Sequence, residues 1–228
     1  MSEEDITINN IVLKKKFYAL LKLINNQKYE YFIVCDSEID IIKENFNINN
    51  IYKKITHIFD NKYIYSGTVN NDYFNNTTKK STEFFLIKDD IIKLKELTLN
   101  YKLYYWFSDL PVYKRSHLYD FFSKIDYTNT DYAFDHLIYL NYLALYHNFK
   151  FVNITPILNY NFSLELYNTT DIEDLKKLED IKYSFSWVTD KFFNNNKDYL
   201  LQQGSFLLYH IDRNHIDMRT IHHALALV

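Results

Sequence analysis

Glycine is nearly absent from this chain, which has only Gly67 and Gly204 among its 228 residues. An average composition of about 7% glycine would give roughly 16. Loops that bind phosphate through backbone amides need two or three closely spaced glycines, because only glycine lets the backbone approach the ligand closely. The sequence therefore excludes a Walker loop and a dinucleotide-binding loop. A nucleotide would have to be held by side chains and a metal ion.

Charge and cysteine content exclude further classes of protein. The net charge is -3, whereas domains that hold nucleic acid by phosphate contacts carry a basic excess, so no nucleic-acid partner is expected. A local basic face stays open. Cys35 is the single cysteine, which excludes an intrachain disulfide and a zinc site built on a cysteine cluster. We expect no signal peptide, no membrane span and a cytoplasmic location. The oligomeric state stays open.

Helical and strand-like patterns alternate along the chain, which predicts an α/β fold. Without repeats or a linker rich in proline, glycine or serine, we expect a single domain over 1–228, with a mixed, mostly parallel sheet flanked by helices. Helices are expected over residues 13–25, 41–46, 89–97, 116–125, 132–147, 171–181 and 216–227. Strands are expected over residues 31–35, 55–59, 62–67, 83–87, 101–107, 150–155, 158–167 and 205–210, and a polar loop over 68–81.

Two carboxylates follow the first predicted strand, in the stretch YFIVCDSEI. Side chains at i and i+2 of an extended chain point to the same side, so Asp36 and Glu38 would converge where the strand meets solvent. Open α/β sheets bind ligands at this edge, and paired carboxylates suit Mn²⁺ or Mg²⁺, which can also hold a diphosphate. The alternative is that the strand end is polar only because the chain reaches the surface.

The stretch YYWFSDLPVYKRSH places an aromatic ring, an acid and an arginine close together in the sequence. Trp106 can stack on a sugar ring or a base, and Asp109 in the following turn can bind hydroxyls. Arg115 is one of three arginines among 26 basic residues, and its planar guanidinium suits a phosphate or carboxylate. The alternative is that Trp106 belongs to the core and that Pro111 only ends the strand.

Asp135 and His136 lie in the first turn of the longest predicted helix, in FDHLIYLNYLALYHNF. At the ligand edge of a sheet, Asp135 would serve as a general base. The alternative is that an acid near a helix N-terminus is favoured by the helix dipole alone.

The stretch GSFLLYHIDRNHIDM follows the second glycine. His210 and Asp212 at i and i+2 could share a face, which would combine a metal ligand with a ribose or phosphate contact. Arg213, another of the three arginines, follows directly. The alternative is that His210 is a hydrogen-bonded surface residue at a strand end.

The stretches YEYFIVCDSEI, YWFSDLPVYKRSHLYDFF, FDHLIYLNYLALYHNF and SFLLYHIDR resemble, in this order, GT-A-type glycosyltransferases, particularly divergent ones of large DNA viruses. The resemblance extends from Lys16 to Arg213. It implies a single α/β domain that moves a sugar from a nucleotide-sugar donor to a glycan or other hydroxyl acceptor, with Mn²⁺ or Mg²⁺ on the diphosphate. It also implies a viral protein of the host cytoplasm.

Carried over to this chain, the resemblance implies metal ligation by Asp36, Glu38 and His210, with Glu38 in place of a second Asp. Asp135, or failing that Asp109, would deprotonate the acceptor hydroxyl. The residues expected to contact substrates are Trp106, Arg115, His136, Asp212 and Arg213. Only 35 residues precede Asp36, which implies an abbreviated donor half, a donor site completed by a partner, or lost catalysis.

Three hypotheses follow for the function. The first is a metal-dependent glycosyltransferase. The second is a metal-dependent phosphoesterase or nuclease that uses the same acids with His210, Asp212 and His215. The third is a catalytically inactive, glycosyltransferase-like binding protein whose acids are surface residues.

Overall fold

A computed structural model describes residues 8–34, 39–41, 48–68, 72–105, 111–129, 131, 133–153, 187–188, 198 and 208–210. The chain forms two compact units. The first comprises Met1–Val34 and His57–Phe162, and the second comprises Cys35–Thr56 and Ser163–Val228. A compact unit is not by itself a separately folding domain, so the single domain over 1–228 stays a prediction.

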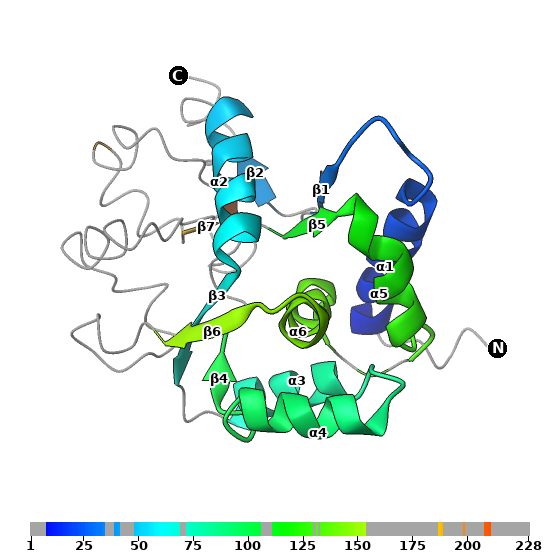
Figure 1. Ribbon diagram of the computed structural model, residues 1–228, viewed down its shortest axis with the longest axis vertical. Coiled ribbons are helices and arrows are strands. Elements are labelled where there is room, and N and C mark those ends of the chain that lie inside the picture. Colours follow the sequence, from blue (N-terminus) through cyan, green and yellow to red (C-terminus); the bar gives the residue numbers. More distant parts are fainter. Residues whose placement is uncertain are drawn as a thin grey trace. The chain divides into compact units, whose positions relative to one another are not determined.

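The first unit carries most of the described helices and strands (Figure 1). Its helices are α1 (Ile8–Leu23), α3 (Asp72–Thr82), α4 (Lys88–Leu97), α5 (Arg115–Lys124), α6 (Asp135–Tyr146) and the end of α2 (Ile48–Asn61). Its strands are β1 (Tyr31–Ile33), β3 (Tyr63–Thr68), β4 (Leu103–Tyr104), β5 (Val112–Lys114) and β6 (Lys150–Asn153). The second unit contains β2 (Ile39–Ile41), the start of α2, β7 (Trp187–Val188) and β8 (Leu208–His210).

The described strands form small sheets. In the first unit β3 lies between β4, which is antiparallel to it, and β6, which is parallel, while β1 pairs antiparallel with β5. In the second unit β8 lies between the antiparallel β2 and the parallel β7. The predicted α/β class with mixed sheets is confirmed. The expected mostly parallel sheet is wrong for the described strands, because β1–β5, β2–β8 and β3–β4 are all antiparallel pairs.

Helix α6 lies at the centre of the first unit, where Figure 1 shows it along its axis. It packs against α1, α3 and α4. A helix that is apolar on all sides is buried on all sides, and the run from Leu137 to Ala144 is buried without interruption. Elements of the first unit therefore position their polar side chains around this helix.

Helix α3 occupies most of the segment that the sequence predicts as a loop, and that prediction is wrong. The polar sequence DYFNNTTKKST forms a helix because its small hydroxyl side chains can be buried with their hydrogen bonds satisfied. Thr77 Oγ1 donates to the carbonyl of Tyr73 at 2.8 Å, and Ser81 Oγ donates to that of Thr78 at 2.6 Å. Thr78 Oγ1 donates a hydrogen bond to the carbonyl of Leu103 on β4 at 3.2 Å.

Helix α2 replaces the first strand of the predicted hairpin around Asp60 and Asn61. Ile51, Ile55 and Phe59 are buried at a spacing of four residues, which is a helical stripe. Lys62 then ends the helix with φ of 56° and donates its N–H to the carbonyl of Ile58. The predicted turn is therefore a helix C-terminus, and β3 follows it as predicted.

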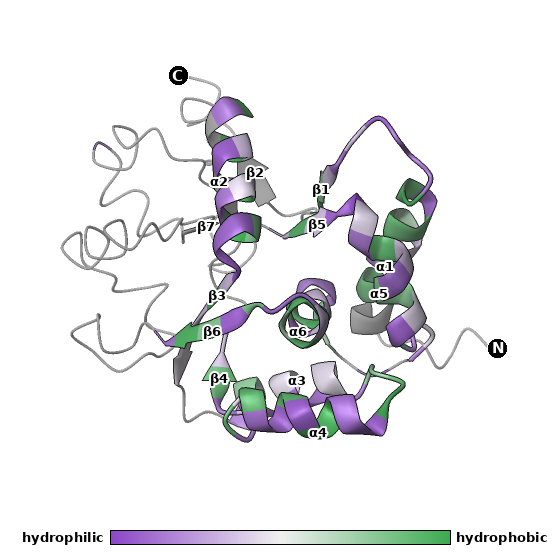
Figure 2. Cartoon of the chain, viewed as in Figure 1, coloured by the Kyte–Doolittle hydropathy of each residue, from purple (hydrophilic) through white to green (hydrophobic). Residues whose placement is uncertain are grey.

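The remaining predictions divide by position along the chain. The helices α1, α4, α5 and α6 confirm the helices predicted over residues 13–25, 89–97, 116–125 and 132–147. Along α4, hydrophilic and hydrophobic residues are interspersed (Figure 2). The strand expected over 83–87 is wrong, because the chain turns there and keeps a single bridge from Phe85 to Ile125. Residues 39–41 are a strand, and 42–46 of the helix expected there lie outside the described residues. The same holds for the elements expected over 158–167, 171–181 and 216–227.

Candidate functional site

Asp135 begins α6 and is almost fully buried, with 3% of its surface exposed. Its Oδ1 lies 3.1 Å from Lys16 Nζ on α1, and its Oδ2 accepts a hydrogen bond from the Tyr113 hydroxyl on β5. The acid, the ammonium and the phenol thus join three elements at the start of α6. Lys16 is 119 residues away in the sequence, so no local pattern could have indicated this pair. As a general base, Asp135 stays a prediction.

His136 follows Asp135 and lies edge-on to the ring of Tyr113, with 5.8 Å between the ring centroids. Burial and, to a smaller extent, repulsion from the Lys16 ammonium together lower the pKa of His136 to about 3. The imidazole is therefore neutral near pH 7, and it can offer one donor and one acceptor to a ligand. The predicted substrate contact of His136 is not tested by this geometry.

Arg115 begins α5 and ties that helix to the segment before β1. Its Nε donates to the carbonyl of Tyr29 at 3.1 Å, and its backbone N–H donates to the carbonyl of Glu30 at 2.8 Å. One edge of the guanidinium thus has a structural partner. The predicted contact of Arg115 with a phosphate or carboxylate stays a prediction.

The predicted metal ligands fall on the second unit, in which β2 pairs with β8. Ile39 lies opposite His210 in the antiparallel register of the two strands. Glu38 directly precedes Ile39 in the sequence. The strand that follows the acidic motif is therefore hydrogen-bonded to the strand that ends at His210.

Several predicted site residues lie outside the described residues: Asp36, Glu38, Trp106, Asp109, Asp212 and Arg213. His210 is described for its backbone alone. Among the side chains that the structure does describe, no group of three or more His, Cys, Asp or Glu is arranged to hold a metal ion. The metal site thus stays a prediction.

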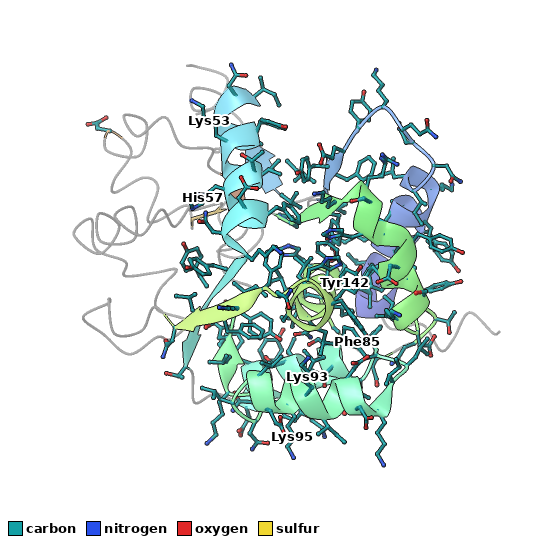
Figure 3. The ribbon with its side chains drawn as sticks, in the orientation of Figure 1. Lys53, His57, Phe85, Lys93, Lys95 and Tyr142 are labelled. Atoms are coloured by element: carbon teal, nitrogen blue, oxygen red, sulfur yellow. The ribbon has the colours of Figure 1, made fainter. Side chains whose placement is uncertain are left out.

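A cluster of aromatic and titratable side chains between α5 and α6 is absent from the sequence predictions. The rings of His117 and His147 stack with centroids 3.9 Å apart and planes 16° apart. Tyr139 and Tyr142, the latter labelled on α6 in Figure 3, each form a hydrogen bond to one of these rings. The spacings of His117 with Asp120 and of Tyr139 with Tyr142 place each pair on one helix face, which is the signal that could have indicated the cluster.

Comparison with known proteins adds no relative, since no family model, curated protein or solved structure matches this chain. None of the helices in the described part of the chain has the length and apolar character needed to cross a membrane. The class that the structure defines is a mixed α/β protein with small mixed sheets.

Proposed function

We propose that this protein is a metal-dependent glycosyltransferase of the cytoplasm that moves a sugar from a nucleotide-sugar donor to a hydroxyl acceptor. The supporting observation is the pairing of β2 with β8, in which Ile39 lies opposite His210. The acidic motif precedes one of these strands and a histidine ends the other. Both strands belong to the second compact unit.

Asp36, Glu38 and His210 would hold Mn²⁺ or Mg²⁺, for which carboxylate and imidazole ligands are suitable. When bound, the metal would supply charge neutralisation on the departing diphosphate. This arrangement agrees with a chain that has two glycines and cannot build a phosphate-binding loop from backbone amides.

In the reaction, the acceptor oxygen forms a bond to the anomeric carbon as the bond from that carbon to the diphosphate breaks. A carboxylate takes the acceptor's proton, and the nucleoside diphosphate leaves with the electron pair. We assign the base to Asp109, because both oxygens of Asp135 already have buried partners in Lys16 and Tyr113. Trp106 would stack on the acceptor sugar.

The test is a thermal-shift screen of the full chain with UDP- and GDP-sugars, with and without Mn²⁺, followed by an assay for released nucleoside diphosphate. A ligand present at about 100 times its Kd stabilises the folded state by about 2.7 kcal/mol. We expect a Mn²⁺-dependent rise in Tm that is lost in Asp36→Asn and in Glu38→Gln. Asp89→Asn, which removes an exposed carboxylate on α4, is the matched control and should respond like the wild type.

Other outcomes would identify the alternatives. Mn²⁺-dependent hydrolysis of a phosphodiester without any response to sugar nucleotides would replace the proposal by a phosphoesterase or nuclease. Binding of a sugar nucleotide without release of nucleoside diphosphate to any acceptor would indicate an inactive binding protein. An unchanged response in both motif variants would show that the acids are not the metal site.

A further inference from the structure

The stacked pair of His117 and His147 is held in place by two tyrosine hydroxyls. Tyr139 Oη accepts the backbone N–H of Lys114 at 3.1 Å and lies 3.0 Å from His117 Nδ1. Because the hydroxyl oxygen already accepts a hydrogen bond, we assign its proton to the contact with His117. His117 Nδ1 is then the acceptor, and Nε2 carries the proton of the neutral ring.

His147 has the same tautomer, but it uses the other nitrogen for its hydrogen bond. Tyr142 Oη donates to Asp120 Oδ2 at 3.0 Å, since a carboxylate is the stronger acceptor, and it lies 2.8 Å from His147 Nε2. His147 therefore donates from Nε2 to Tyr142, and its Nδ1 is the acceptor. Each ring keeps one nitrogen that forms no hydrogen bond to another described residue.

Two lysines act through their charge on this pair of imidazoles. Burial, together with smaller effects of His147 and of the ammonium groups of Lys114 and Lys62, lowers the pKa of His117 to about 4, although Asp120 acts to raise it. Burial also lowers the pKa of His147. The two lysines lower this pKa as well, whereas Asp120 raises it. Two neutral rings thus lie within the electric field of two cations.

The charges around the rings are unequally compensated. Asp120 on α5 is the carboxylate that contacts this cluster, and its Oδ1 also lies 3.7 Å from Lys124 Nζ. Lys114 Nζ lies 3.8 Å from Glu30 and over the rings of Tyr31 and Phe59, at 5.8 Å and 5.7 Å from their centroids. Lys62 is exposed and forms no ion pair with a described carboxylate. The surroundings therefore carry an excess of positive charge that an anion would relieve.

A metal ion does not suit this pair. Ring nitrogens bind a metal through lone pairs in the ring plane, at about 2.0–2.1 Å. Two stacked rings whose planes are 16° apart and whose centroids are 3.9 Å apart direct their lone pairs side by side and not toward one point. An oxyanion, which accepts separate hydrogen bonds from several donors, fits better.

We propose that Lys62, Lys114, His117 and His147 form a binding site for a phosphate-type oxyanion, and that binding of the anion adds a proton to the imidazole pair. The lysines supply charge, His117 supplies the N–H donor at Nε2, and protonation of His147 adds a second N–H donor at Nδ1. Because the site gains a proton, its affinity for an anion of constant charge, such as sulfate, rises as the pH falls from about 8 toward 5. The proposal uses residues of the first unit alone and does not rest on the glycosyltransferase activity.

The test is calorimetric titration of the full chain with inorganic phosphate at about pH 6, in two buffers of different ionisation enthalpy. Sulfate is titrated in parallel, because its own charge does not change between about pH 5 and 8 and any proton taken up then belongs to the protein. We expect proton uptake with sulfate, and with both anions side-chain NMR resonances that report protonation of the imidazole pair. Titrations with pyrophosphate and with UDP then show whether the site prefers a free phosphate or a nucleotide.

Variants with opposite expected signs make the test specific. Lys62→Met and Lys114→Met should each weaken phosphate binding about tenfold, the effect of losing one charged contact. Asp120→Asn, which keeps an acceptor for Tyr142 but removes the opposing charge, should tighten it about threefold. Lys95→Met on the outer side of α4, labelled in Figure 3, is the matched control and should leave it unchanged.

Two results would overturn the proposal. One is that the wild type binds no phosphate, or that Lys62→Met and Lys95→Met bind phosphate with the same affinity. The other is a heat of sulfate binding that does not depend on the buffer, since the imidazoles would then take up no proton. Because the Lys62 side chain is exposed, Lys62→Met is expected to fold like the wild type, which keeps the test decisive.

Discussion

At the scale of single residues, burial decides which charge a side chain carries. His117 and His136 are held neutral by their surroundings, whereas Asp135 is matched by the ammonium of Lys16 at 3.1 Å. The difference follows from the surroundings, because burial among rings and hydroxyls favours a neutral imidazole, whereas the Asp135 carboxyl group has the Lys16 ammonium as a direct partner. In weak acid the unfolded chain therefore binds more protons at these histidines than the folded chain does.

In the absence of phosphate, we expect the free energy of unfolding to decrease as the pH is lowered. The unfolded chain binds a proton at His117 near the usual pKa of 6.5, while the folded chain binds it only near 4, so the free energy of unfolding decreases as pH falls through this window. With allowance for the partial exposure of the ring, His117 contributes about 1 kcal/mol of the loss between pH 7 and 5. Urea unfolding at both pH values should show a smaller loss in His117→Gln.

The control for this measurement is His57→Gln, on the α2 helix. His57 contacts Asn61 one turn later in the same helix, and it takes no part in the stacked pair. We expect the wild-type pH dependence in this variant. An equal loss of stability in wild type and His117→Gln would show that His117 is not held neutral.

At the scale of elements, the shortage of glycine changes how helices end. Left-handed backbone is usually supplied by glycine, yet here it is adopted by Lys62, Leu99, Asn100, Tyr101 and Asn148. Three of these residues are consecutive after α4, with φ of 52°, 58° and 67°. A side chain at each such position meets the steric penalty that glycine avoids.

Leu99→Gly should therefore stabilise the protein, although it removes an apolar side chain. Leu99 is 55% exposed, so little packing is lost, and the left-handed conformation costs about 1–2 kcal/mol for a residue with a Cβ. We expect the free energy of unfolding to rise by about 1 kcal/mol, measured by urea denaturation. Leu97→Gly, two residues earlier at the last residue of α4, should lower it by up to about 1 kcal/mol. The same sign for both variants would contradict this explanation.

At the scale of the whole molecule, a buried polar network holds the first unit together around α6. The Tyr105 hydroxyl, just after β4, donates to Asn141 Oδ1 at 2.6 Å, and Asn141 Nδ2 donates to Ser81 Oγ on α3 at 2.9 Å. Burial raises the pKa of Tyr105, so the phenol stays protonated and remains a donor. The network specifies how α3, α6 and the end of β4 pack.

Asn141→Leu should weaken this packing. The change removes one hydrogen bond from Tyr105 and one from Ser81 in a fully buried place, and we expect a loss of about 2 kcal/mol in the free energy of unfolding. Adding Tyr105→Phe should cost less in the Asn141→Leu background than in the wild type, which a double-mutant cycle measures. Additive losses would show that the two side chains are not coupled.

Sequence patterns predicted the parts of this protein that depend on local spacing. The α/β class, the helices α1, α4, α5 and α6, and the strands β1, β3 and β6 follow from apolar periodicity within a few residues. The near absence of glycine by itself excludes a glycine-rich phosphate loop. The spacing of Ile51, Ile55 and Phe59 carried the signal for α2, but the neighbouring β-branched residues favoured a strand.

Tertiary structure alone decided which polar residues are buried and with which partners. The hydroxyls of α3 are buried because the carbonyl groups around them accept their protons. Asp135 meets Lys16 across 119 residues, and His117 meets His147 between two helices. Free energies of this kind depend on groups distant in the chain, so no local pattern contains them. The charge state of these residues therefore follows from the folded environment, while their positions on helix faces follow from the sequence.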